Sequence, residues 1–514
     1  MTIWKKISST SGKGAYEGKA RGDNMEKKIS STSLKINLVL NTFLQILSTI
    51  APLLTAPYIS RVLGPENIGI FSYTLSINSY FVLIAGLGTA SYGIIEIAKV
   101  RDSTSNRSRV FWGIELISII TSSLSLAIWL FMIMFYRKYS IIFAIQSLYI
   151  LATVFDISWF YLGIEKLKHT VVINSFFKIL GVILIFIFVK SKSDLLIYIF
   201  ILSFSSLLGN FSMWLFLPKY ITLAKVSIRE MKNHFKGTFI YFVPTIAATI
   251  YSVVDKTLIG IITKDAIENG CYEQAGKIIG LVRSVAYTSI NTLFSSRMAY
   301  LFTQNKQGEI KFRLKMSLDL VLILSYGACF GIIAIAQDFV PIFFGAGYSR
   351  VVGFLALMAP LLPIMGISSS VGYLYYNPSG NRKKSATILV IGTLINCLLN
   401  VVLITLYAGY GAIVASLIAE ILITVLYIIY SNGYVTFNMI FKLSLKKIIS
   451  GLCMVTIIQI LSRVMECSIM SLLLQISCGA VIYCIVLILL RDEFIFNMTL
   501  KGISLIKRRL YKNG

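Results

Sequence analysis

The sequence predicts an all-α protein that crosses a membrane many times, and three observations support this fold class. The chain of 514 residues is 56% hydrophobic. Its mean hydropathy is +0.79. Apolar runs of about 20 residues, the length of a membrane-spanning helix, recur along the chain. The ten-residue alternation that marks a β-barrel strand does not occur in the sequence. We therefore expect a polytopic integral membrane protein.

Fourteen apolar runs, separated by clusters of charged residues, are candidate membrane helices. They cover roughly residues 37–60, 67–89, 110–136, 139–163, 170–189, 194–217, 238–262, 275–299, 316–345, 351–376, 384–407, 410–431, 446–463 and 468–490. The Gly64-Pro65 step is expected to form the outer turn between the first two.

The first and seventh candidate helices resemble each other weakly. The first carries Pro52 and then Arg61, and the seventh carries Pro244 and then Lys256, at offsets of roughly 190–200 residues. This repeat predicts two pseudo-symmetric lobes of six helices each, followed by two further helices. The expected domains are a disordered cytoplasmic tail (1–33), an N-lobe (34–218), a cytoplasmic linker (219–237), a C-lobe (238–432), two additional spans (433–490) and a basic cytoplasmic tail (491–514).

The net charge of +26 fits a membrane protein better than a nucleic-acid-binding one. Lys and Arg residues collect in the short segments between apolar runs, without a long basic stripe. If the N-terminus is cytoplasmic, about 36 of the 48 basic residues fall on the cytoplasmic side and about nine on the opposite side. Positively charged loops favour the cytoplasm, so we expect both termini to be cytoplasmic.

Enzymatic chemistry finds little support in the sequence. No loop exceeds roughly 20 residues, so there is no room for a catalytic domain. The two histidines, His169 and His234, lie far apart, and the seven cysteines show no CxxC spacing. No nucleophile or ATP-binding motif is recognisable. We therefore expect a protein that is not an enzyme and that has no metal site and no cofactor.

Two stretches near the start of the chain resemble a known family. PYISRVLGPENIGIFSY (57–73) and SYFVLIAGLGTASYGIIEIAKVRD (79–102) are similar to the opening of Wzx-type bacterial polysaccharide flippases. These belong to the superfamily of multidrug, oligosaccharidyl-lipid and polysaccharide (MOP) exporters, which also holds lipid II flippases and multidrug/Na⁺ antiporters. The likeness continues more loosely in FDISWFYLGIEK (155–166), SVVDKTLIG (252–260) and NPSGNRKK (377–384). The family commonly has twelve spans, so the last two of the fourteen are additional.

The resemblance implies a transporter in the bacterial cell membrane that works by alternating access. Two six-helix lobes would surround a central cationic cavity. The cargo would be an undecaprenyl-diphosphate-linked oligosaccharide, flipped from the cytoplasmic to the outer leaflet for capsule, O-antigen or other exopolysaccharide assembly. Implied partners are the lipid bilayer, a coupling H⁺ or Na⁺, and a polysaccharide polymerase or assembly proteins. Nucleic acid is not among them.

Intramembrane cations are the candidate residues for the diphosphate, because fixed positive charge offsets the desolvation of phosphates. Arg283 lies inside the eighth candidate span, with a buried structural ion pair as the alternative. Lys178 lies inside the fifth, although its stem can also reach the nearer interface. Arg61 and Lys256 occupy matching outer ends of the first and seventh spans, where an interface anchor is the alternative.

Intramembrane acids are the candidates for ion coupling or for pairing with these cations. Glu420 falls near the middle of the twelfth span, where a hydrogen bond to a neighbouring helix is the alternative. Asp255 adjoins Lys256, but neighbours on a helix point in different directions, so we expect Asp255 to meet another helix. Asp156 is expected to line the cytoplasmic half of the N-lobe.

Two other functions compete with the flippase. A multidrug or cation antiporter of the same fold would favour an acidic cavity, whereas the deep basic residues of this chain favour an anionic cargo. A membrane-embedded polysaccharide polymerase or glycosyltransferase would need a larger loop than any in this sequence.

Overall fold

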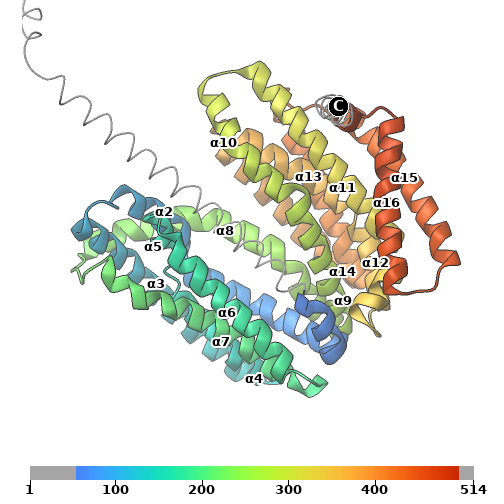
Figure 1. Ribbon diagram of the computed structural model, residues 1–514. Helices are drawn as coiled ribbons and strands as arrows, with labels where there is room; N and C mark the ends of the chain where they lie inside the picture. Colours follow the sequence, from blue (N-terminus) through green and yellow to red (C-terminus); the bar gives the residue numbers. More distant parts are fainter. Residues whose placement is uncertain (1–53, 497–514) are drawn as a thin grey trace, which may run out of the picture.

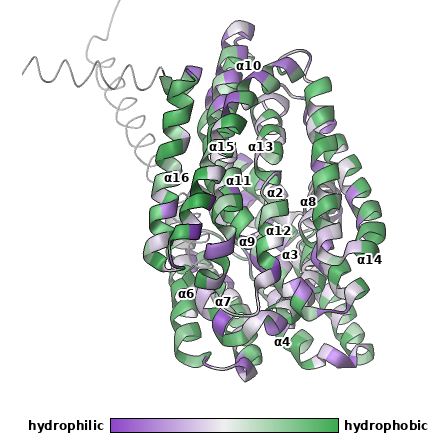
Figure 2. Ribbon diagram, turned by 90° about the vertical axis from the view of Figure 1, so that its right-hand side faces the viewer, coloured by the Kyte–Doolittle hydropathy of each residue, from purple (hydrophilic) through white to green (hydrophobic). Residues whose placement is uncertain are grey.

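The computed structural model describes residues 54–496, apart from the side chains of residues 167–171 and 243–244. Within these residues every regular element is a helix, which confirms the all-α class (Figure 1). Most of the first predicted span, 37–60, lies outside the described residues. Large apolar side chains such as Phe131, Leu398 and Leu473 are exposed on the outside. In Figure 2 hydrophobic residues predominate along most helices, as expected for helices that cross a lipid bilayer.

The N-terminal group of helices occupies residues 54–219. After a first helical stretch at 54–86, the elements are α2 (Thr89–Lys99), α3 (Thr104–Phe135), η1 (Arg137–Tyr139), α4 (Ser140–Val154), α5 (Ser158–Gly163), α6 (Leu167–Phe188), η2 (Lys192–Asp194), α7 (Leu195–Met213) and η3 (Trp214–Lys219). We call this group the N-lobe.

The C-terminal group follows the long helix α8 (Ile228–Thr263). Its elements are α9 (Ala266–Arg283), the π-helix η4 (Ser284–Thr288), α10 (Ser289–Thr303), α11 (Gln307–Phe344), α12 (Ser349–Met358), α13 (Leu361–Val371), the π-helix η5 (Gly372–Tyr376) and α14 (Arg382–Ile429). We call residues 266–429 the C-lobe. The last two helices are α15 (Phe437–Val464) and α16 (Ile469–Leu489).

Nine helices of the described residues are long and apolar enough to cross a membrane, or ten if the bent pair α12 and α13 forms one span. The predicted count of fourteen is not established by this number. Part of the difference comes from α14, which covers the predicted spans 384–407 and 410–431 in one helical stretch. Another part comes from α6, of which only the segment Val172–Phe188 is considered for this count.

Backbone breaks occur close to where the sequence predicts turns. Gly64 has a φ of +77°, a left-handed conformation that interrupts the helical stretch 54–86 and that glycine adopts without a Cβ penalty. In α14, Ala408 has a φ of 51° and a ψ of −131°, between two predicted spans. These two kinks explain how continuous helical stretches can contain pairs of spans.

Helix α9 begins at Ala266, although the sequence predicts a span that starts at residue 275. The reason is that its first turns carry polar side chains that are buried, including Glu268, Asn269 and Gln274. Hydropathy alone hides such a start. Together α9, η4 and α10 run without interruption from 266 to 303, so Arg283 lies about 26 Å from the start and close to the middle.

Helix α8 connects the two lobes by packing on each in turn. It begins with a capping box, in which the Ser227 Oγ accepts a hydrogen bond from the Glu230 N–H at 3.2 Å. The Ser227 N–H donates back to Glu230, which lowers the pKa of that carboxyl. The first half of α8 lies against the N-lobe, where the Tyr92 hydroxyl and the His234 Nδ1 are 3.0 Å apart. The second half lies against α14, where Asn400 donates to Asp255 at 2.6 Å.

The two lobes contact each other directly at one end of the bundle, formed by residues 58–76, 256–274 and 342–348, which we call the closed end. Among the described residues, all hydrogen bonds between the N-lobe and residues 266–429 lie at this end. Gly69 and Gly270 let the backbones meet, because a Cβ on Gly69 would stand 1.7 Å from the Ala266 oxygen. Away from the closed end the lobes diverge (Figure 1).

The C-terminal pair α15 and α16 is attached to α11 near both of its ends. Near one end, Lys447 is fully buried and its Nζ lies 2.6 Å from Asp319 and 3.0 Å from Asp492. Near the other end, the carboxylate of Asp338 accepts hydrogen bonds from Ser462 on α15 and Gln475 on α16. The pair is therefore fixed to the C-lobe by buried polar contacts as well as by apolar packing.

Replacing Lys447 with Met should lower the free energy of unfolding by about 3–5 kcal/mol, because two buried carboxylates lose their cation. The measurement is the thermal unfolding midpoint of the purified protein in detergent. Lys442→Met is the matched control, since Lys442 is exposed on the same helix. Equal midpoints for the two variants would contradict the role of the buried triad.

Candidate functional site

Two cavities flank the middle of α8, away from the closed end. Each has a volume of about 520 Å³. Thr245 and Thr249 line the cavity on the N-lobe side, and Tyr251 and Ser252 line the cavity on the C-lobe side. Because one helix contributes to both walls, the two cavities are the two sides of a candidate central site.

The C-lobe cavity contains an arginine from the middle of a long helical stretch. Arg283, at the end of α9, is exposed to this cavity. Among the described residues, no carboxylate lies within ion-pair distance of its guanidinium. An unpaired guanidinium in a low-dielectric region favours an anion with two or more oxygens.

Glu420 lines the same cavity from α14 and is 4% exposed. The Tyr251 hydroxyl of α8 donates to its carboxylate at 2.5 Å, and the Ser368 hydroxyl of α13 donates at 3.4 Å. The structure therefore brings Arg283 and Glu420, which are 137 positions apart in the chain, into one cavity. The carboxylate is held by hydroxyl groups rather than by Arg283.

Two π-helical turns shape the wall of the C-lobe cavity. The π-helix η4 follows Arg283 directly and supplies Tyr287 and Thr288, while η5 supplies Gly372 and Tyr373. A π-turn widens the helix by one residue, and such turns occur frequently at functional sites. The sequence pattern did not predict either of them.

Asp255 lies outside the two cavities, in a buried network inside the C-lobe. Its carboxylate accepts hydrogen bonds from Tyr272 on α9 at 2.5 Å and from Ser416 on α14 at 3.0 Å. Asn400, also on α14, donates to it at 2.6 Å and to Asn396 at 3.1 Å. The Asn400 Oδ1 is buried and has no hydrogen-bond partner among the described residues.

The N-lobe cavity is lined by one acidic residue and, among the described residues, by no basic one. Asp156 lines it, and its Oδ1 accepts a hydrogen bond from the Ser158 N–H at 3.0 Å, at the start of α5. Glu115 on α3 is fully buried in the same lobe, and among the described residues neither of its carboxylate oxygens has a hydrogen-bond partner. A bare carboxylate in such a place needs a proton or a cation. The sequence interpretation missed Glu115, although a single acid within FWGIELISII (111–120) was a readable signal.

Two of the remaining candidate cations lie at the closed end. Lys256 forms an ion pair with Glu273 at 2.6 Å, and Glu273 also accepts a hydrogen bond from Ser72 of the N-lobe at 3.0 Å. Arg61 donates to the Ile342 carbonyl at the end of α11. Both residues therefore take part in the contact between the lobes.

Lys178 is the remaining candidate cation, and it occupies an exposed position on α6. It lines neither of the two cavities beside α8. Of the four candidate cations, Arg283 alone is placed in the wall of the candidate central site.

Comparison with known proteins places these features in context. The family described as "Polysaccharide biosynthesis protein" matches residues 34–294, which are 261 of the 514 residues. A protein of Escherichia coli K12 named "Putative O-antigen transporter" is 25% identical over 405 residues, covering 77% of this chain and 96% of that protein. A Haloferax volcanii protein named "Probable low-salt glycan biosynthesis flippase Agl15" is 24% identical over 216 residues, covering 42% of this chain and 45% of that protein.

Solved structures share the fold. The lipid II flippase MurJ in an inward closed conformation aligns with a TM-score of 0.69 and 18% identity, covering 90% of this chain and 99% of that chain. An inward-facing multidrug resistance transporter of the MATE family, from the MOP superfamily, aligns with a TM-score of 0.56 and 13% identity, covering 80% and 96%. This chain therefore shares its overall fold with these two transporters.

Proposed function

This chain belongs to the family of polysaccharide biosynthesis proteins, and from that premise we propose that it flips a lipid-linked oligosaccharide across the bacterial cell membrane. The cargo is an undecaprenyl-diphosphate-linked repeat unit, which moves from the cytoplasmic to the outer leaflet for surface polysaccharide assembly. The names of the relatives, transporters and flippases, support transport rather than enzymatic chemistry.

One observation carries the proposal, which is the position of Arg283. It offers an unpaired positive charge to a cavity in the middle of the bundle. A diphosphate loses its hydration when it enters a low-dielectric region, at a cost that a charge-assisted contact with a guanidinium offsets. The lipid tail needs no such contact, because it can stay in the bilayer during transport.

The arrangement of the lobes supports alternating access. The lobes are in contact at the closed end, and the two cavities lie between this end and the opposite end of the bundle. If both termini are cytoplasmic, as the distribution of basic residues predicts, the closed end faces outward. The described arrangement is then an inward-facing state, in which the diphosphate enters from the cytoplasm. Opening of the closed end releases the cargo on the other side.

We assign ion coupling to three acids, of which Asp255 and Glu420 are buried and Asp156 is partly buried. Asp255, Glu420 and Asp156 are the candidates for H⁺ or Na⁺ coupling. Around Asp255, its carboxylate and the Ser416 hydroxyl supply oxygens of the kind that hard cations take, while the Asn400 amide N–H donates to the carboxylate. Its contacts join α8 to two helices of the C-lobe, so a change in its charge would alter how these three helices pack.

A competing hypothesis is that the protein is a cation antiporter of the same fold, and the acids Glu115 and Asp156 of the N-lobe favour it. Glu115 and Asp156 would attract a cationic compound rather than a phosphate. The two hypotheses predict that the cargo binds on different sides of α8. A flippase depends on the charge of Arg283, whereas an antiporter of cations depends on these carboxylates.

Deletion of the gene in its native host tests the proposed function. The expected result is loss of one surface polysaccharide, accumulation of its lipid-linked repeat unit inside the cell, and recovery of both on complementation. Immunoblotting of surface glycan and extraction of the lipid fraction measure the two quantities. Intact surface polysaccharide in a host that has no second flippase would contradict the proposal.

A further inference from the structure

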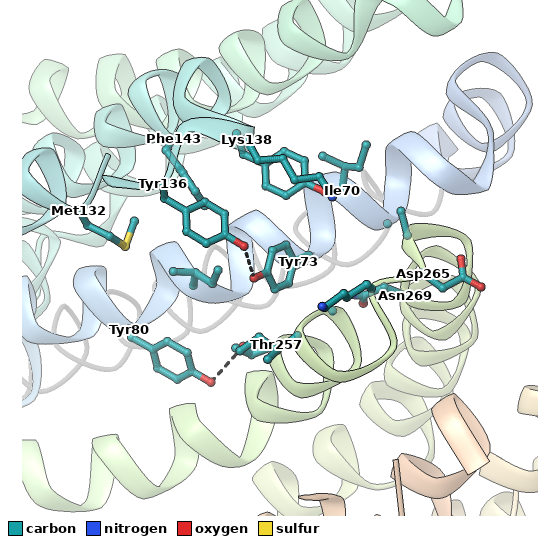
Figure 3. Close-up of a pocket in the computed structure, with 17 residues that line it drawn as sticks. Ile70, Tyr73, Tyr80, Met132, Tyr136, Lys138, Phe143, Thr257, Asp265 and Asn269 are labelled. Atoms are coloured by element: carbon teal, nitrogen blue, oxygen red, sulfur yellow. Dashed lines mark hydrogen bonds between the residues drawn. The ribbon is translucent and has the colours of Figure 1, made fainter. Parts of the chain in front are cut away.

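A third cavity lies at the closed end, apart from the two cavities beside α8. Its volume is about 680 Å³. One wall comes from the N-lobe, where the helical stretch 54–86 meets the end of α3 and the start of α4. The other wall comes from the last turns of α8 and the first turns of α9 (Figure 3). The cavity therefore exists only while the two walls are together.

Tyrosine side chains dominate the N-lobe wall of this cavity. Tyr73, Tyr80, Tyr136 and Tyr139 all line it. The Tyr73 and Tyr136 hydroxyls are 3.2 Å apart, and the Tyr80 hydroxyl lies 3.1 Å from the Thr257 Oγ1 on α8 (Figure 3). Such rings offer flat apolar faces together with hydrogen-bonding hydroxyls at their tips. This combination suits sugar rings, which present apolar C–H faces and many hydroxyl groups.

A buried polar atom on the opposite wall has no partner. Asn269 is fully buried and lines the cavity, and its amide donates to the Lys256 carbonyl at 2.8 Å. Among the described residues, its Oδ1 accepts no hydrogen bond. Leaving a buried acceptor unsatisfied is unfavourable. A hydroxyl group from a ligand in the cavity would satisfy it.

Two lysines also line the cavity, one on each wall. Lys138 comes from η1 and Lys264 from the residue that follows α8, and both are exposed. Neither forms an ion pair with a described residue. The Lys138 ammonium lies over the Tyr139 ring, 5.1 Å from its centroid. Ammonium groups without a carboxylate partner, next to aromatic rings, favour a ligand that carries a phosphate or carboxylate as well as sugar rings.

We propose that this tyrosine-lined cavity is a second binding site, which takes a saccharide that bears an anionic group at the closed end of the protein. The proposal rests on the proposed function, since the transported oligosaccharide is the source of such a ligand. A saccharide bound here contacts both walls at once. It therefore favours the arrangement in which the closed end is shut, because a ligand shifts an equilibrium by its preference for one state.

Saccharide binding to the purified protein in nanodiscs tests the proposal. The probes are tetragalacturonate, which is acidic, and maltotetraose, which is neutral. Saturation-transfer NMR and calorimetry should show that tetragalacturonate binds more tightly. Tyr136→Ala should weaken its binding about tenfold, which corresponds to the loss of about 1.4 kcal/mol. Replacing Lys138 and Lys264 with Gln should abolish the preference for the acidic probe.

Lys192→Gln is the matched control, since Lys192 is exposed near the closed end but does not line this cavity. This variant should bind both probes like the parent protein. The lysine variants also keep the test informative if Tyr136→Ala does not fold. Binding that none of the cavity variants changes, or no binding of either probe, would overturn the proposal.

Two further competition experiments identify which kind of anionic ligand the cavity binds. Inorganic phosphate, and nanodiscs made with phosphatidylglycerol, should each compete weakly with tetragalacturonate. Competition as strong as that of the saccharide itself would identify a phosphate or lipid headgroup site and would overturn the sugar assignment. Failure of this inference can be distinguished from failure of the proposed function. A protein that still restores surface polysaccharide in the deletion host but binds neither saccharide refutes only this inference.

Discussion

A disulfide between residues 76 and 257 should stop transport completely and reversibly. Ser76 of the N-lobe and Thr257 of α8 are buried, and their hydroxyl oxygens lie 2.8 Å apart. Two Cys side chains at these positions are close enough to form a disulfide. The bond would hold the closed end shut, and a transporter that alternates between two states cannot work from one of them.

The experiment replaces the seven native cysteines and adds Ser76→Cys and Thr257→Cys. Export of surface polysaccharide should fall to the level of the deletion strain after oxidation, and should return after reduction with dithiothreitol. Ser108→Cys with Thr222→Cys is the matched control, because these hydroxyls are 3.5 Å apart and belong to α3 and the loop before α8. Transport by an oxidised 76–257 variant at the parental rate would show that the closed end need not open.

Replacing Arg283 with Ala should reduce transport about 10–100-fold, since a hydrogen bond to a charged group contributes about 1.5–3 kcal/mol. Membrane insertion and thermal stability should stay unchanged, because the side chain is exposed and forms no ion pair with a described residue. Lys at this position should restore part of the activity, as it keeps the charge but loses the planar fork. The rate of surface polysaccharide appearance measures these effects.

Arg297 is the matched control for Arg283. It lies on α10 in the same continuous helical stretch but pairs with Glu309 at 3.2 Å outside the cavity. Arg297→Ala should leave transport close to the parental rate. If Arg283→Ala and Arg297→Ala behave alike, the cavity charge has no special part in moving the cargo.

Much of the fold was predictable because apolar length and charge clusters report membrane helices directly. The kinks at Gly64 and Ala408 fall where the sequence predicts turns between spans. The start of α9 was not predictable in the same way. Its polar residues are buried against other helices, and hydropathy counts them as exposed. The sequence therefore underestimates how far Arg283 lies from the start of its helix.

Partners of the candidate residues depend on tertiary contacts that local patterns do not contain. In the sequence, Lys256 and Arg61 are candidate cations for the cargo like Arg283, but they lie in the contact between the lobes rather than beside the cavity of α8. The sequence shows Glu115 as a single acid in an apolar run, but its full burial follows only from tertiary contacts. The tyrosine-lined cavity draws its walls from residues almost 200 positions apart, such as Tyr73 and Asn269.

Transbilayer movement of the cargo in proteoliposomes tests the central claim most directly. Purified protein is reconstituted with an undecaprenyl-diphosphate-linked oligosaccharide, and the sugar in the inner leaflet is protected from a membrane-impermeant oxidant. We expect the parent protein to make this protected fraction accessible, whereas Arg283→Ala and the oxidised 76–257 variant leave it protected. A protected fraction that stays the same with and without the parent protein, over a range of pH and Na⁺ gradients, would contradict the account.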